Sequence, residues 1–181
     1  MRPRHVAPVL AAAVFLAACG PRTEPPPAPP QASGSAPGAS PSTADRASAQ
    51  RDAVAAYVGM WRAYESAAAD GDTSGAATSR YATGNALDLI NRAVHAIVKD
   101  GLRAQGTSVL APQATDVRGA DHPTEVRVED CMDTSNTRLV KVDGSKYPDS
   151  PGGRRKMIAT VRLGDSGWQV VSFGLGGVGT C

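Results

Sequence analysis

Three acidic residues near the middle of the chain, Glu129, Asp130 and Asp133, are the best candidates for chemistry. Side chains alternate between the two faces of a β-strand, so Asp130 shares a face with Val126 and Val128. The valines predict that this face points into the core. A carboxylate in apolar surroundings binds a proton more readily than one in water, which makes Asp130 the candidate general base.

A structural role is the alternative for Asp130, and we favour it. Its carboxylate would then pair with Arg127, Arg138 or water near the end of the strand. The sequence contains no G-x-S-x-G elbow and no P-loop, and no other pattern indicates a catalytic triad. We therefore have no confident catalytic residue.

Metal and nucleotide motifs are equally weak. After the leader described below, the chain retains only His95 and His122, without an H-E-x-x-H or a paired C-x-x-C pattern, so we expect no metal and no cofactor. Residues 174–179 match G-x-G-x-x-G, but that motif needs a following helix and only Thr180 and Cys181 remain. We expect these glycines to let the tail pass close to a sheet.

Aromatic residues follow a helical period in the first half of the chain. They lie within an apolar stripe that predicts a helix over residues 47–69, ended by Gly71. The aromatic members, which are the candidate pocket residues, are Tyr57, Trp61 and Tyr64. Packing in the core is the alternative role for this stripe, and it is the more common one.

Further elements must hold these residues in place. We expect a short helix over residues 74–81 and a longer one that starts after Thr83 and stops before Gly101. Turn residues then separate five predicted strands, at residues 106–116, 125–133, 137–142, 156–163 and 168–175. Helices followed by an antiparallel meander predict an α+β fold, with the N-terminal helices packed in a curved antiparallel sheet.

The start of the chain resembles the leader of a bacterial lipoprotein. Arg2 and Arg4 precede a short apolar run that ends in the lipobox-like tetrapeptide Leu16-Ala17-Ala18-Cys19. The run is shorter than the ~20 residues of a transmembrane helix. We expect residues 1–18 to be removed as a signal peptide and Cys19 to carry palmitate-type acyl chains. Retention as a membrane helix is the alternative, and the small residues before the cysteine argue against it.

A spacer follows the leader over residues 19–45. This stretch is rich in Pro, Ala and Ser and is expected to be disordered, because it cannot bury enough apolar surface to fold. Recognition of its prolines by a partner is the alternative. The folded domain is expected over residues 46–181. Without Arg2 and Arg4, the 19 Lys and Arg residues fall to 17 and equal the 17 Asp and Glu residues, so we expect no binding to nucleic acid.

The cysteine count also depends on the leader. Of the 3 cysteines, only Cys131 and Cys181 remain once Cys19 is assigned to lipid. Export would place them in an oxidising compartment, so we expect them to form a disulfide. Two separately buried thiols are the alternative.

Several short motifs resemble secreted lipoproteins of high-GC actinobacteria with a nuclear-transport-factor-2-like (NTF2-like, SnoaL-like) domain. The motifs are YATGNAL at residues 81–87, VEDC at 128–131, GWQV at 167–170 and GVGTC at 177–181. The resemblance implies a cone of curved sheet wrapped around helices, with a pocket at its open end. It implies no activity, because this fold hosts both enzymes and binding modules.

Together these features predict a non-catalytic binding or structural module. It would be lipid-anchored on the outer face of the cytoplasmic membrane and contact an unknown ligand or protein of the envelope. The alternative is a small-pocket isomerase, dehydratase or hydrolase that uses Asp130. A homodimer is possible, but an aromatic content of 4% gives it no support. The basic run at residues 154–156 could bind acidic polymers or lipid headgroups, although solvated surface is the more common role of such a run.

Overall fold

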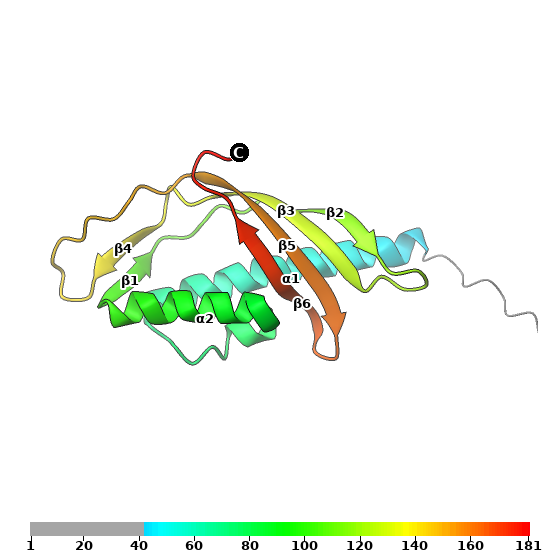
Figure 1. The fold of residues 1–181 in the computed structure, drawn as a ribbon, viewed down its shortest axis with the longest axis horizontal. Coiled ribbons are helices and arrows are strands. Elements are labelled where there is room, and N and C mark those ends of the chain that lie inside the picture. The colour runs from blue at the N-terminus through cyan, green and yellow to red at the C-terminus, as the bar shows by residue number, and fades with distance from the viewer. Residues whose placement is uncertain (1–41) are drawn as a thin grey trace, which may run out of the picture. The chain divides into compact units, whose positions relative to one another are not determined.

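Two helices pack against an antiparallel sheet in the computed structural model, which describes residues 42–181 (Figure 1). The predicted signal peptide, Cys19 and the predicted spacer as far as residue 41 lie outside the described residues, so these remain predictions. The α+β class is confirmed. The elements are α1 (Thr43–Asp70), a 3-10 turn η1 (Thr78–Arg80), α2 (Gly84–Lys99), β1 (Leu102–Gln105), β2 (Gln113–Arg118), β3 (Glu125–Asp133), β4 (Arg138–Lys141), β5 (Arg154–Gly164) and β6 (Gly167–Leu175).

Helix α1 has a defined cap at each end. The Ser42 hydroxyl oxygen accepts the Asp45 backbone N–H at 3.1 Å, and the Asp45 carboxylate accepts the Ser42 N–H at 3.2 Å, which forms a capping box. Gly71 closes the helix with φ of 76°, as the sequence predicts. The helix therefore begins at Thr43 and takes in the last three residues of the predicted spacer.

Small side chains let α1 approach the sheet closely. Tyr57 and Trp61 of the predicted stripe are buried, and Met60 beside them is fully buried although the stripe does not include it. Alanines make up all the remaining buried positions of the helix, at Ala49, Ala53, Ala56, Ala63, Ala67 and Ala68. Helix α1 contacts β1, β2, β3, β5 and β6, while α2 contacts β1 and β6.

The strands form two sheets instead of the predicted single meander. The larger sheet has the order β2-β3-β5-β6, and β1 pairs with β4 in a separate two-stranded sheet (Figure 1). Strand β4 leaves the meander because Thr134 and Gly153 bind each other at the point where β3 ends and β5 begins. The Thr134 backbone N–H donates to the Gly153 carbonyl oxygen at 3.1 Å. Residues 134–153 are therefore an excursion from the β3–β5 pair.

Two predicted elements are wrong in part. The strand predicted over residues 106–116 begins only at Gln113, because Gly106 turns with φ of 83° and Pro112 cannot donate a ladder hydrogen bond. The strand β1 before Gly106 is one that the sequence pattern did not indicate. The short helix predicted over residues 74–81 is reduced to the 3-10 turn η1. In the described part of the chain, no helix combines the length and apolarity needed to cross a bilayer.

Candidate functional site

The inward face of β3 carries the predicted catalytic candidate. Val126, Val128, Asp130 and Met132 are buried, while the residues between them are more exposed. Asp130 is 5% exposed and shares the apolar face, as the alternation predicts.

Both carboxylate oxygens of Asp130 accept hydrogen bonds from the protein. The Tyr57 hydroxyl donates to Oδ2 at 3.0 Å, and the Ala111 backbone N–H donates to Oδ1 at 2.9 Å. The predicted partners, Arg127 and Arg138, are wrong. Each is on the surface and binds another residue, Arg127 to Glu129 and Arg138 to Gln105.

Tyr57 serves Asp130 as a neutral donor. Burial raises the pKa of the Tyr57 hydroxyl well above its usual range, and the Asp130 carboxylate raises this pKa further. The indole N–H of Trp61 lies near the Tyr57 hydroxyl oxygen without reaching full hydrogen-bond geometry. It has a smaller, opposite effect and lowers the pKa of Tyr57. The Tyr57–Asp130 pair thus has the character of a satisfied buried hydrogen bond.

The other two members of the acidic cluster have interaction partners of their own. Glu129 faces outward, where Lys156 and Arg127 hold the pKa of its carboxyl below the usual range. Asp133 accepts the backbone N–H of Ser135 at 2.9 Å, which lowers its pKa. Asp130 and Glu129 both border a surface groove of about 470 Å³ beside the disulfide, but Asp133 does not, so the structure does not assemble the three acids into one site.

A separate pocket of about 360 Å³ lies where the C-terminal part of α1 meets the small sheet and the loop before β5. Trp61 and Tyr64 line this pocket, whereas Tyr57 lies deeper, beside Asp130. Two of the three predicted pocket residues therefore reach it. The aromatic stripe is shared between the core and the pocket wall.

Trp61 fixes the aromatic wall of the pocket. Its ring packs edge-on against Tyr64 at a centroid distance of 5.7 Å and against Phe173 of β6 at 5.4 Å. Six apolar side chains extend this wall around the pocket: Ile97, Ala104, Met132, Leu139, Leu175 and Val178.

Arg155, which the sequence indicates only as part of the basic run at residues 154–156, is one of the polar residues that line the pocket. It lies opposite Met132 in the β3–β5 register and on the same strand face as the buried Met157. Its Nε is buried and has no hydrogen-bond partner among residues 42–181. No carboxylate of the described residues lies within 4.0 Å of the Arg155 guanidinium, which is the limit for an ion pair.

Both carboxylates in the pocket wall are already engaged. Glu65, whose side chain is 10% exposed, accepts the Ser108 N–H at 2.7 Å and binds Arg62 at 2.6 Å. Asp149 accepts the Leu139 N–H at 2.6 Å. Neither forms an ion pair with Arg155.

The C-terminal tail completes one side of the pocket. Cys131 and Cys181 are at disulfide distance, with Cα atoms 5.9 Å apart, in agreement with the predicted pairing. The glycine-rich segment follows β6 with no helix. The Gly176 and Gly179 N–H groups instead bind carbonyl oxygens of β5 at 2.8 and 2.7 Å. This path places Val178 at the pocket.

The two histidines of the described residues are exposed, His95 on α2 and His122 in the turn before β3. Within residues 42–181, no group of three or more His, Cys, Asp or Glu side chains is arranged to hold a metal ion.

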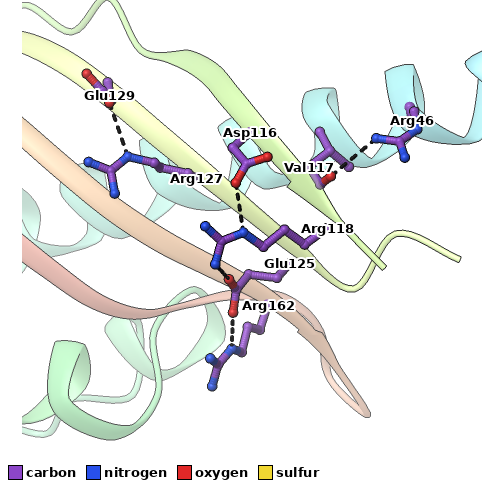
Figure 2. Close-up of polar contacts among 8 residues, drawn as sticks. All are labelled: Arg46, Asp116, Val117, Arg118, Glu125, Arg127, Glu129 and Arg162. Atoms are coloured by element: carbon purple, nitrogen blue, oxygen red, sulfur yellow. Dashed lines mark hydrogen bonds and ion pairs between the residues drawn. The ribbon is translucent and has the colours of Figure 1, made fainter. Parts of the chain in front are cut away.

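The outer face of the large sheet differs in character, because three of its arginines have carboxylate partners (Figure 2), while Arg154 donates to Cys131 Sγ at 3.2 Å. Arg118 binds Asp116 at 2.7 Å and Glu125 at 3.3 Å, and Glu125 also binds Arg162 at 2.7 Å. Asp116 and Glu125 raise the pKa of Arg118. Arg127 binds Glu129 at 3.1 Å.

The comparisons with known proteins show the fold and no more. No protein-family profile matches the chain, and no curated protein matches its sequence. Among solved structures, the chain is similar to the intermembrane space region of the chloroplast protein ARC6, with a TM-score of 0.56 and 14% identity. The match covers 70% of this chain and 95% of that one. At this identity the likeness carries the fold only.

Proposed function

We propose that this chain is a lipid-anchored binding module of the cell envelope and that the 360 Å³ pocket holds a small ligand. One observation carries the proposal: a pocket with an aromatic and aliphatic wall contains a few polar groups, among them Arg155. Small-molecule sites in proteins have this size and this balance of apolar wall and sparse polar groups.

The proposed location rests on the sequence. Acylation of Cys19 would hold the domain on the outer face of the cytoplasmic membrane, and the proline-rich spacer would lift it away from the bilayer. A ligand or protein of the envelope is then the proposed partner. Without its predicted leader the chain has 17 acidic and 17 basic residues, so it has no net field that favours nucleic acid.

We also propose that the fold is an NTF2-like cone. Helices α1 and α2 lie against the large antiparallel sheet (Figure 1). Residues of both helices and of the sheet line the pocket. This arrangement supports the assignment that the short sequence motifs suggest.

An enzyme that uses Asp130 is the alternative function. The groove beside Asp130 and the adjacent Tyr57 hydroxyl are the features that favour it. Both carboxylate oxygens of Asp130 already accept hydrogen bonds from the protein, as in a structural role, so the binding module is the better-supported function.

Binding of the neutral fluorescent probe N-phenyl-1-naphthylamine tests the proposed function. The protein is the full chain carrying Cys19→Ala, so that no acyl chain competes for the pocket. We expect saturable binding of the probe to the parent. Leu139→Trp should fill the pocket and reduce the affinity at least about tenfold, because excluding the apolar probe from the pocket wall loses about 1.4 kcal/mol or more of binding free energy.

The matched control is Val140→Trp, since Val140 follows Leu139 in β4 and side chains alternate between faces. The control should bind the probe as the parent does. Equal binding by both variants, or no saturable binding by the parent, would show that the pocket is not a ligand site.

A further inference from the structure

We propose that the ligand of this pocket is an apolar carboxylate and that Arg155 binds its carboxylate group. This inference rests on the proposed function, because it names the class of ligand for the same pocket. The guanidinium would anchor the charged end, and the aromatic wall around Trp61 would contact the apolar body.

The first argument is the unsatisfied donor. A buried polar group without a hydrogen-bond partner is costly. Arg155 Nε is in this condition within the described segment, on the inner face of β5 and at the wall of the pocket. A ligand oxygen would supply the missing acceptor.

The second argument is the charge of the pocket wall. Glu65 is neutralised by Arg62 at 2.6 Å. Arg138 and Asp149 carry opposite charges, on β4 and on the neighbouring loop, and both line the pocket. The positive charge of Arg155 remains without a counterpart, so the pocket as a whole favours a single anionic group.

The third argument is the chemistry of the remaining wall. Two of its hydroxyl groups are used locally: Thr134 Oγ1 donates to the Gly153 carbonyl oxygen at 3.0 Å, and Thr137 Oγ1 donates to the Thr134 carbonyl oxygen at 2.9 Å. They are poorly placed to bind the hydroxyls of a sugar. The planar guanidinium matches a carboxylate in a two-bond arrangement, and the apolar wall requires an apolar body behind it.

Isothermal titration with decanoate, decan-1-ol and decyltrimethylammonium tests this inference, each below its micelle concentration and in the Cys19→Ala full chain. We expect decanoate to bind at least about tenfold more tightly than decan-1-ol, because a charge-assisted hydrogen bond is worth a factor of this size. The ammonium probe should bind most weakly.

Two neighbouring variants separate charge from position. Arg155→Met should remove the preference for decanoate over decan-1-ol, and Arg155→Lys should keep part of it. Arg154→Met is the matched control, because the same charge is lost from the opposite face of β5. The control should retain the full preference.

Each outcome decides one of the two proposals. Equal binding of decanoate and decan-1-ol, or a preference that survives Arg155→Met, would overturn the carboxylate inference. The proposed function would still stand if N-phenyl-1-naphthylamine binds and Leu139→Trp blocks it. Failure of that neutral probe would overturn the proposed function itself, whatever decanoate does.

Discussion

Arginine side chains have different surroundings on the two faces of the large sheet. On the outer face, Arg118, Arg127 and Arg162 each lie within 3.3 Å of a carboxylate, and their side chains are 45–66% exposed (Figure 2). On the inner face, Arg155 has a buried Nε and no such partner in the described segment. Exposed pairs contribute little to stability, whereas a buried unpaired donor is costly. The unpaired residue is therefore the better indicator of a binding site.

The inner face itself also contains a contrast. Asp130 is buried, and both of its oxygens accept hydrogen bonds, from Tyr57 and from Ala111. Arg155, on the neighbouring strand, lacks an acceptor for Nε. A carboxylate satisfied by its own fold has a structural role, and an unsatisfied guanidinium in a pocket is open to a ligand.

The largest change in the free energy of unfolding is expected from loss of the disulfide, whose first cysteine lies on the outer face of β3. Replacing both Cys131 and Cys181 by serine should lower the free energy of unfolding by about 4 kcal/mol, because the disulfide closes a loop with a sequence separation of 50. Urea unfolding of the double variant and of the oxidised parent measures this loss. A loss below about 1 kcal/mol would mean that the outer face gains little from its covalent link.

Removal of the buried hydrogen bond should have the next largest effect. Tyr57→Phe leaves one oxygen of Asp130 without its donor and should cost about 1–3 kcal/mol in urea unfolding. Tyr81→Phe is the control, because Tyr81 is 37% exposed. Equal losses for the two variants would contradict a structural role for the Tyr57–Asp130 pair.

The same variant makes a prediction about pH. The pKa of Tyr57 is raised in the folded state, so its contribution is complete below the ordinary tyrosine pKa of about 10 and is lost as the pH rises above it. The parent should therefore lose stability more steeply between pH 9 and 11 than Tyr57→Phe.

The smallest effects concern the arginines. Arg162→Ala should cost less than about 1 kcal/mol, since the Arg162 side chain is 60% exposed in its pair with Glu125, and added salt should reduce the loss further. Arg155→Met should cost nothing or raise the stability, because it replaces an unpaired cation in an apolar wall. Thermal unfolding of both variants checks this order, and a clear loss in Arg155→Met alone would reverse it.

The sequence pattern predicts the regular parts of this fold well. The bounds of β3 agree with the prediction because alternating valines lie between clear turn residues. The Gly71 cap and most of the aromatic stripe are also correct. The strand pattern fails around Gly106. It does locate β4, predicted over residues 137–142, but not the pairing of β4 with β1, which joins distant parts of the chain that no local pattern encodes.

The candidate site is less visible in the sequence. The Tyr57–Asp130 bond joins residues 73 positions apart, so no spacing rule reveals it. Arg155 stands in a run of three cations, which is typical of a solvated surface. Counting back by two from the buried Met157 would have placed Arg155 on the inner face, and this alternation is the signal that could have identified it.

That run of cations has a consequence for how the pocket is specified. A slip of β5 by one residue would bring Arg154 or Lys156 to the position of Arg155, so this position would hold a cation in each of the three registers. The same slip would turn Met157, Ala159 and Val161 to the outside. The choice of cation is thus made by apolar residues further along the strand. Mutations of these apolar residues that leave the charge untouched should therefore change which cation lies at the proposed ligand site.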